Sequence, residues 1–314
     1  MKRPKIVVVG SSNTDMVVKA ARIPAPGETI LGGAFVMAAG GKGANQAVAA
    51  ARLGAEVTLV ARLGADSLGD ESIAGYARDA ILTDLIVRDP DRATGVALII
   101  VDARGENSIT VALGANEALS PADVERAGDR IRAADAVVMQ LEVPLDAVEQ
   151  AAAIARAAGV PVILDPAPAP DGGLPASLLR NVTCLKPNET EAERLTGIRV
   201  GDPATAERAA RALQELGPRT VIITLGSQGA VVVDDAAVQH VRAFRVQAVD
   251  TTAAGDAFTG ALATAIGAGI TLKDAVRQAA AAGALAATRM GAQPSLPTQS
   301  EWEAFLAAHE TGRA

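Results

Sequence analysis

Short apolar runs rich in Val and Ile alternate with Ala-rich segments along most of the chain, and few folds accommodate this alternation. Uniformly apolar strands separated by helices predict a mainly parallel α/β sheet that helices cover on both faces. The predicted strands lie within residues 5–10, 56–64, 135–140, 160–165, 181–188 and 219–226. The predicted helices include 44–53, 69–80, 121–132, 145–158 and 203–216, the last with Asp202 as N-cap, Pro203 in its first turn and Gly217 at its end.

Two segments do not fit this alternation. Residues 14–37 contain Pro and Gly with rough alternation, and residues 94–112 read as two strands around the polar turn "DARGEN". We expect them to pair into a small separate sheet over one edge of the main domain, covering the substrate, a second subunit or both. The predicted division is 1–13, 38–93 and 113–314 for the large domain, and 14–37 and 94–112 for the small sheet.

Composition favours a small-molecule partner. The net charge of the 314 residues is −7, aromatic residues make up 2%, and no basic block is present, which argues against nucleic-acid binding. The single cysteine, Cys184, lies in an apolar run, which predicts a buried thiol in a protein of a reducing compartment. His240 and His309 lie far apart and have no neighbouring Cys or His, so we do not expect a zinc site. The first apolar run is too short for a signal sequence, and no stretch is long enough to span a membrane, so we expect a soluble cytoplasmic protein.

The stretch "GGKGAN", residues 40–45, resembles a phosphate loop only superficially. A Walker motif needs a hydroxyl residue after its lysine, and here Gly43 follows Lys42. A dinucleotide fingerprint also fails, because "GSSNTD" follows the first strand. Asn13, Asp15, Lys42 and Asn45 instead offer donors and acceptors suited to a polyol. The alternative is ordinary turn chemistry, in which Asn, Asp and Gly shape two loops.

The stretch "VDTTAAGDAFTGALATAI", from Val249, carries a stronger signal. A strand is followed by a loop of small residues, and Asp256 opens a long apolar helix. The N–H groups of residues 253–256 would point out of the helix start and favour an anion. Asp256 could accept the proton of an alcohol that attacks a phosphoryl group, or could simply cap the helix.

Two further stretches have open interpretations. The turn "TLGSQGA", residues 224–230, follows a strand and fits a nucleotide site of an open α/β sheet or a plain hairpin turn. Asn188 and Glu191 lie on the first turn of a predicted helix. They could hold water around a magnesium ion, or they could form a helix cap.

At these residues the sequence resembles the ribokinase-like family of carbohydrate and nucleoside kinases along essentially its whole length. The stretches "GGKGANQAVAAARLGA" and "VDTTAAGDAFTGAL" are similar to the two family signatures, with "PNETEAERLTGI" and "ITLGSQG" between them in the family's order. The resemblance implies a Rossmann-like three-layer α/β/α sandwich with a β lid that serves as a homodimer interface. It also implies transfer of the γ-phosphoryl group of ATP to O5 of D-ribose.

The resemblance also implies roles for individual residues. The sugar would be bound by Asn13, Thr14, Asp15, Gly41, Lys42, Gly43, Asn45 and Glu142, with Asp256 as base and Ala253, Ala254 and Gly255 completing the anion hole. The nucleotide would lie along Asn188, Thr224, Leu225, Gly226, Ser227, Gln228, Gly229, Gly255 and Ala280. Magnesium would be held by ATP and by water near Asn188 and Glu191. Activating potassium would lie at Asp250, Thr252, Ala286, Arg289, Gly291 and Ser295.

Sibling functions remain open at this point. "GSSNTD" and "GGKGANQAVAA" look closest to the ribose members of the family, whereas fructose, deoxyribose, nucleoside and keto-sugar acid kinases share parts of the signatures. Low aromatic content argues against a nucleoside, whose base would stack on a ring. A non-catalytic sugar-binding protein is the alternative from another class, and the retained Asp256 argues against it.

Overall fold

The computed structural model describes residues 3–310, and its centre is a nine-stranded sheet. The order of the strands across the sheet is β13-β12-β11-β10-β9-β8-β1-β4-β5, and β12 alone runs antiparallel to its neighbours. The prediction of a mainly parallel sheet is therefore confirmed. The strands are β1 Lys5–Val9, β4 Glu56–Gly64, β5 Ile86–Asp89, β8 Ala136–Met139, β9 Val162–Leu164, β10 Cys184–Leu185, β11 Thr220–Thr224, β12 Ala230–Val233 and β13 Val238–Val241.

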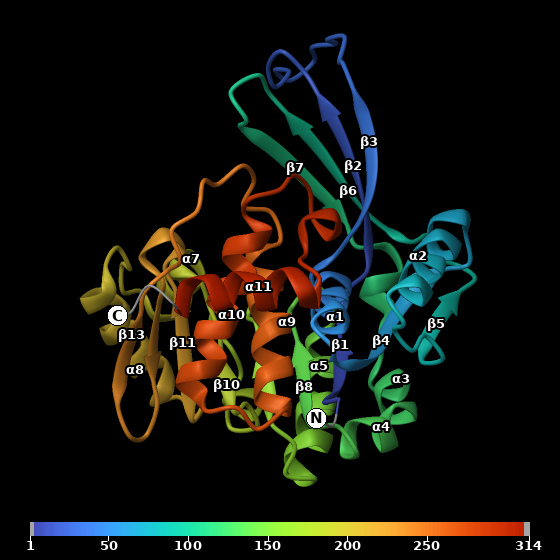
Figure 1. Cartoon of the computed structure of the whole chain (residues 1–314). Helices are drawn as coiled ribbons and strands as arrows, with labels where there is room; N and C mark the ends of the chain where they lie inside the picture. The colour runs from blue at the N-terminus through green and yellow to red at the C-terminus, as the bar shows by residue number, and fades with distance from the viewer. Residues whose placement is uncertain (1–2, 311–314) are drawn as a thin grey trace.

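Helices cover both faces of this sheet because the apolar strands present side chains to both sides (Figure 1). In β1, Ile6 and Val8 belong to the hydrophobic cluster that includes residues of α1, α9 and α10, whereas Val7 and Val9 belong to the cluster that includes residues of α3, α4, α5 and α8. The helices are α1 Lys42–Arg52, α2 Ser67–Arg78, α3 Pro121–Arg126, α4 Gly128–Arg132, α5 Leu145–Ala157, α6 Ala176–Leu179, α7 Glu189–Thr196, α8 Pro203–Gln214, α9 Ala254–Gly267, α10 Leu272–Ala286 and α11 Gln299–Glu310.

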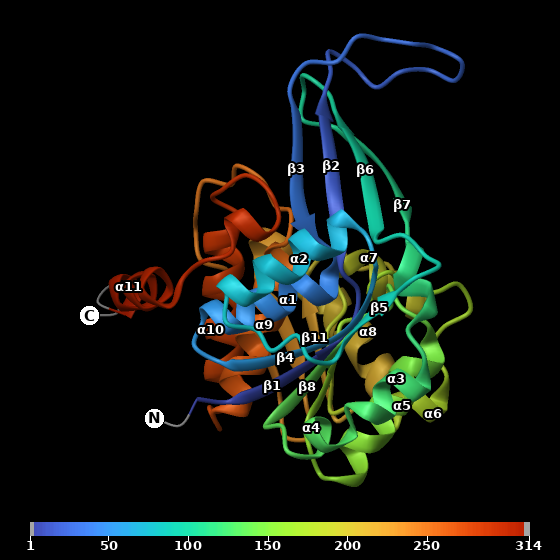
Figure 2. The same ribbon diagram turned by 90° about the vertical axis from the view of Figure 1, so that its right-hand side faces the viewer.

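The two unusual segments form a second, four-stranded sheet of order β3-β2-β6-β7. Its strands are β2 Asn13–Lys19, β3 Phe35–Gly40, β6 Gly95–Val101 and β7 Asn107–Ala112. Strands β2 and β6 pair in parallel, and the two outer strands pair antiparallel with them. Figures 1 and 2 show this small sheet projecting away from the large domain, beyond the carboxyl end of β1.

Local details differ from the sequence-based expectations at helix ends. The predicted helix 121–132 is two short helices that meet at Ala127 and Gly128, where a glycine weakens the helix. The helix α8 begins as predicted, because Oδ1 of Asp202 accepts the N–H of Thr205 at 2.8 Å, but it ends at Gln214 rather than 216. Cys184 is buried, which raises the pKa of its thiol to about 12. Among the described helices, none has the length and apolarity that a membrane crossing requires.

Candidate active site

The starts of β2, α1 and α9 meet beyond the carboxyl end of β1, which is where open α/β sheets bind ligands. Two glycines make this meeting possible. A Cβ on Gly41, whose φ is +88°, would lie 2.7 Å from the backbone nitrogen of Asn13, and one on Gly43 would lie 2.6 Å from the backbone of Gly10. The glycines of "GGKGAN" therefore bring the start of α1 against the backbone of 10–13 rather than wrapping a phosphate.

The carboxylate of Asp256 lies at the centre of this meeting point and is 6% exposed. Its Oδ2 accepts a hydrogen bond from Nδ2 of Asn45 at 2.9 Å, and its Oδ1 accepts one from Nε2 of Gln46 at 2.9 Å. Burial raises the pKa of Asp256, the Lys42 ammonium opposes this, and the Asp165 carboxylate adds to it. Asp256 is thus a fixed carboxylate with a raised pKa, which is the state a general base needs.

Behind Asp256 lies a buried polar network that the sequence analysis did not identify. Nε2 of Gln46 also donates to Oδ2 of Asp165 at 2.9 Å, and Oε1 of Gln46 accepts from Nε2 of Gln140 at 2.6 Å. The Lys186 ammonium contacts the same Asp165 oxygen at 3.0 Å. Two signals were available in the sequence, because Gln46 follows Asn45 directly and Asp165 ends the apolar run 160–165.

Three more charged groups line the site. Oε2 of Glu142 accepts from Oγ of Ser11 at 2.5 Å and from the backbone N–H of Lys42 at 3.0 Å. Burial lowers the pKa of the Lys42 ammonium, but the surrounding carboxylates outweigh burial and raise it, so Lys42 stays charged. Burial, followed by repulsion from Glu142 and Asp256, raises the pKa of Asp15 to about 6. The site therefore holds an excess of carboxylates around Lys42.

The start of β2 presents two of its three predicted residues to the site. Asn13 and Asp15 lie on one face of the strand, and Oδ1 of Asn13 accepts from Nδ2 of Asn116 at 2.8 Å. Thr14 pairs with Ala39 and lies on the opposite face, because side chains alternate along a strand. The side chain of Thr14 therefore points away from those of Asn13 and Asp15, and the sugar contact expected at Thr14 stays a prediction.

The start of α9 keeps most of its predicted open amides. Ala253 adopts the left-handed conformation, with φ of 58°. Within residues 3–310, the N–H groups of Ala253, Gly255 and Asp256 have no hydrogen-bond acceptor, and Gly255 is exposed. The N–H of Ala254, by contrast, donates to the carbonyl of Thr251 at 3.2 Å, so this amide is not open as expected. An anion would meet the remaining amides and the positive end of the helix.

Asn188 and Glu191 form a reciprocal helix cap. Oδ1 of Asn188 accepts the N–H of Glu191, and Oε2 of Glu191 accepts the N–H of Asn188, both at 2.8 Å. The capping interpretation is thus confirmed. Burial and then the Asp165 carboxylate raise the pKa of Glu191, which is typical of a carboxylate placed near other negative charge. The second oxygen of Glu191 remains the group that could meet a cation.

The turn 224–229 connects β11 to the antiparallel β12, so the hairpin interpretation is confirmed as its structural role. Gly226 and Gly229 have φ of +49° and +96°, which a hairpin turn of this kind requires. Thr224 lies next to Asn188 across a parallel bridge. Ala280 lies on α10, partly buried against the core.

The segments 250–252 and 286–295 adjoin each other, as the potassium expectation requires. Oδ2 of Asp250 accepts the N–H of Gly291 at 2.8 Å, and its Oδ1 accepts from Thr252. Burial raises the pKa of Asp250, but these hydrogen bonds outweigh it and lower the pKa. The side chain of Arg289 is paired with Glu301, and Ser295 is buried. Cation binding here would therefore use backbone carbonyls beside an ionised Asp250.

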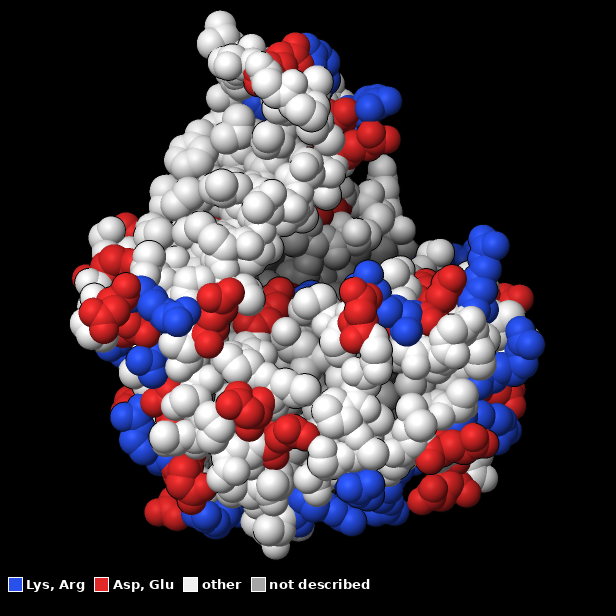
Figure 3. All heavy atoms as spheres, turned by 180° about the vertical axis from the view of Figure 1, so that it is seen from behind, with Lys and Arg blue, Asp and Glu red and all other residues white. Residues whose placement is uncertain are grey.

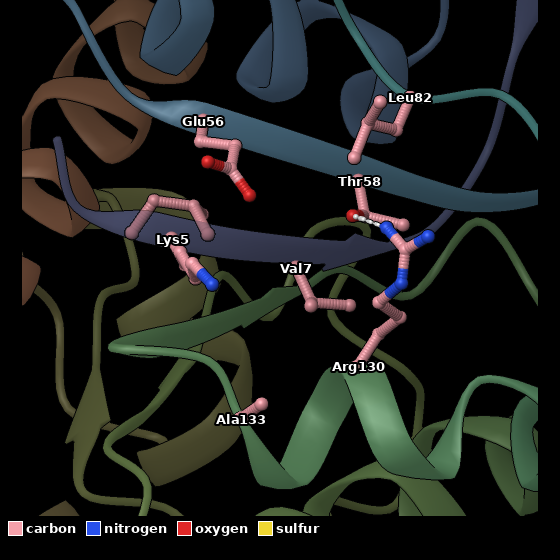
Figure 4. A pocket seen from close by; sticks show the side chains of 8 residues that line it. Lys5, Val7, Glu56, Thr58, Leu82, Arg130 and Ala133 are labelled. Atoms are coloured by element: carbon pink, nitrogen blue, oxygen red, sulfur yellow. Dashed lines mark hydrogen bonds between the residues drawn. The ribbon is translucent and has the colours of Figure 1, made fainter.

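A pocket elsewhere in the large domain is not this site. It has a volume of about 300 Å³ and lies near the amino ends of β1 and β4, opposite the ends where Asp256 lies (Figure 4). Arg130 there is already bonded to Thr58 and Asp84. The space-filling view shows the hollow that matters for the candidate site, between the small sheet and the large domain, with acidic side chains at its margin (Figure 3).

A model of the pfkB family of carbohydrate kinases matches residues 3–299. The chain belongs to this family. It is 44% identical to the ribokinase of Haemophilus influenzae over 304 residues, which cover 97% of this chain and 99% of that protein. It is also 37% identical to the deoxyribokinase of Salmonella typhi, with the same coverage. The structure of Arabidopsis thaliana ribokinase in complex with ribose and ATP superposes with a TM-score of 0.89 at 35% identity, over 97% of this chain and 99% of that chain.

The comparisons agree with the geometry described above. The family establishes a carbohydrate kinase, and the solved structures establish the ribokinase-like α/β fold with its second small sheet. The fold class that the sequence predicted is therefore confirmed.

Proposed function

We propose that this chain transfers the γ-phosphoryl group of ATP to the O5 hydroxyl of D-ribose, with Asp256 as general base. The observation that carries the proposal is the position of Asp256 at the start of α9. Its carboxylate is buried, and the backbone N–H groups of Gly255 and of Asp256 itself are open beside it. An alcohol held beside this carboxylate would lie next to the amides that could bind a terminal phosphate. The similarity to ribokinases along the whole chain supports ribose as the sugar.

The sugar would lie between the start of β2 and the start of α1. Asp15, Asn45 and Lys42 face this space, and each offers a donor or acceptor to a hydroxyl group. Hydrogen bonds to charged groups are worth about 1.5–3 kcal/mol each. Sugar hydroxyls would donate hydrogen bonds to the carboxylates and so stabilise their negative charge. The repulsion among the carboxylates would therefore favour sugar binding.

In the reaction, O5 attacks the γ-phosphorus while its proton passes to Asp256, and the bond from that phosphorus to the bridging oxygen of ADP breaks. The amides of Gly255 and Asp256, at the positive end of α9, would stabilise the charge on the transferring group. Lys42 would favour the ionised form of Asp256 before the sugar hydroxyl arrives.

Two cations belong to the proposal. Magnesium, bound to ATP, would neutralise phosphate charge, and Glu191 could meet its water shell through the oxygen that does not cap α7. Potassium would bind carbonyls of 250–252 and 286–295 beside Asp250, in the segment that leads into the start of α9.

We further propose that two copies of the chain associate through their small sheets, in the cytoplasm. Phe35, Leu98 and Ile109 are 57%, 53% and 52% exposed and lie on both faces of a sheet that the large domain covers only at its base. An exposed apolar sheet of this kind marks an interface, and a second copy offers the matching apolar surface. The buried free Cys184 fits a reducing compartment.

The test is a coupled ADP-release assay over ribose, 2-deoxyribose, fructose and adenosine, with and without potassium. We expect ribose to have the highest kcat/KM, with a margin of about 10- to 150-fold over 2-deoxyribose if Asp15 binds the missing hydroxyl. Potassium should raise the rate. Higher kcat/KM on 2-deoxyribose or fructose would reassign the substrate, and ribose binding without turnover of any sugar would support a sugar-binding protein instead.

A further inference from the structure

The side-chain amide of Gln46 has an unusual position. It is fully buried, and its single nitrogen donates to two different carboxylates, Oδ1 of Asp256 and Oδ2 of Asp165, both at 2.9 Å. Its oxygen accepts from Nε2 of Gln140 at 2.6 Å, which fixes which end of the amide faces the carboxylates. An amide NH₂ has two hydrogens, and both are used.

The partners on the far side of Gln46 are themselves held in place. Asp165 follows β9, is 3% exposed, and is paired with the equally buried Lys186 at 3.0 Å. Oγ1 of Thr259, one turn after Asp256 on α9, lies 3.3 Å from the same Asp165 oxygen and 2.9 Å from the carbonyl oxygen of Gly255. A chain of hydrogen bonds therefore runs from a buried ion pair, through one amide, to the carboxylate at the start of α9.

We propose that Gln46 is a positioning residue for the phosphoryl-transfer reaction, which holds Asp256 in its reactive orientation and links it to the Asp165–Lys186 pair. This inference rests on the proposed function, in which Asp256 is the base. Gln46 touches neither the sugar nor the nucleotide in this role. It fixes Oδ1 of Asp256, while Asn45 fixes Oδ2, so the carboxylate cannot rotate away from the incoming hydroxyl.

The charges around Asp256 predict the direction in which each substitution shifts its pKa. Lys42 from α1, Asp165 after β9 and Asp15 from β2 face Asp256, while Lys186 faces Asp165. A donor to a carboxylate favours its ionised form, and a second carboxylate disfavours it. Gln46 and Asp165 therefore act on the ionisation of Asp256 in opposite directions.

The experiment measures kcat, the KM for ribose, and the pH profile of kcat for Gln46→Met and Asp165→Asn. Gln46→Met keeps the size but removes the donor. We expect kcat to fall by about 10- to 100-fold, the KM for ribose to change by less than about 3-fold, and the acid limb of the profile to move to higher pH. Asp165→Asn removes the charge but keeps an oxygen for Gln46, and its acid limb should move to lower pH. A purely structural role would not produce shifts in opposite directions.

Thr264→Val on α9 is the matched control, since it removes a buried hydroxyl whose bond to the Gly260 carbonyl lies outside the network, and its profile should not move. If Gln46→Met does not fold, Gln46→Glu carries the same expected upward shift. If Asp165→Asn is unstable because Lys186 loses its partner, the double variant with Lys186→Met replaces it.

A folded Gln46→Met with wild-type kcat and an unmoved acid limb overturns the inference while the wild-type activity stands. An upward shift in Asp165→Asn overturns the electrostatic link. If the wild-type protein turns over no sugar, the proposed function itself fails and this inference fails with it, so the two failures are told apart by the wild-type assay.

Discussion

Replacing the carboxylate of Asp256 is the most direct test of the proposed phosphoryl transfer. This carboxylate is the buried acceptor of two side-chain amides at the start of α9. We expect Asp256→Asn to lower kcat by roughly 10²–10⁴, because an amide cannot take the proton of the sugar hydroxyl. ATP should still bind, since the backbone amides remain.

Isothermal titration with ATP and a stopped assay with ribose measure these two quantities separately. Turnover close to that of the wild type would remove Asp256 from the base role. Loss of ATP binding as well would show that the substitution had disturbed the start of α9 instead.

Asp15 shows how function can act against stability at a single residue. Its pKa is raised to about 6, so the folded protein binds more protons than the unfolded chain between roughly pH 4 and pH 6. The ionised carboxylate therefore costs stability above pH 6, and this cost fades as the pH falls through 6. We expect Asp15→Asn to raise the free energy of unfolding by about 1–2 kcal/mol at pH 7.5 while it impairs the use of ribose.

Thermal unfolding of both proteins at pH 7.5 and pH 5 checks the sign. The stabilisation should be largest at pH 7.5 and should shrink at pH 5, where Asp15 of the wild type is already mostly protonated. A gain that is larger at pH 5 would contradict the assigned pKa direction.

At the scale of elements, the packing of α1 against α9 sets the distance between Asn45 and Gln46 on α1 and Asp256, the proposed base, on α9. A Cβ on Gly260 would lie 2.6 Å from Cβ of Ala49 and 2.8 Å from the carbonyl oxygen of Gln46. We expect Gly260→Ala to push the two helices apart, lowering stability by about 1–3 kcal/mol and lowering kcat because Asn45 and Gln46 move away from Asp256.

The matched control is Gly75→Ala on α2, where the new Cβ would meet only the Arg78 side chain, at 3.6 Å. That variant should be neutral or more stable by about 0.5–1 kcal/mol. Chemical denaturation measures the stability of both variants, and the ribose assay measures their kcat. Equal stability and equal kcat in the two variants would contradict the expectation that the spacing of α1 and α9 matters.

Elements were the most predictable level of this structure. The apolar runs in 5–10 and 219–226 predicted strands because periodicity and β-branched residues are local properties. The break at Gly128 and the position of Thr14 on the far face of β2 were missed, because they depend on tertiary packing and strand register. The buried network of Gln46, Asp165 and Lys186 joins three segments far apart in sequence. The positions of Gln46 and Asp165 beside recognised stretches were local signals, but the contacts between them depend on tertiary packing.

For the whole molecule, the proposed association through the small sheet predicts the oligomeric state. We expect Leu98→Lys to convert the proposed dimer into a monomer, because a charge would be placed in the apolar contact between two sheets. Leu216, 49% exposed on the large domain, offers the matched control as Leu216→Lys, which should leave the dimer intact. Sedimentation velocity at several concentrations measures both, and a wild-type protein that sediments as a monomer would exclude the association altogether.

The parallel pairing of β2 with β6 has a consequence for the order in which the chain folds. Asn13 lies beside Gly95, and the intervening segment builds β4, α2 and β5 of the large domain. Closing so long a loop is slow unless other contacts already hold its ends together. We therefore expect the first half of the large domain to form before the small sheet, so that during synthesis β2 waits without its central partner until residues 95–101 have left the ribosome.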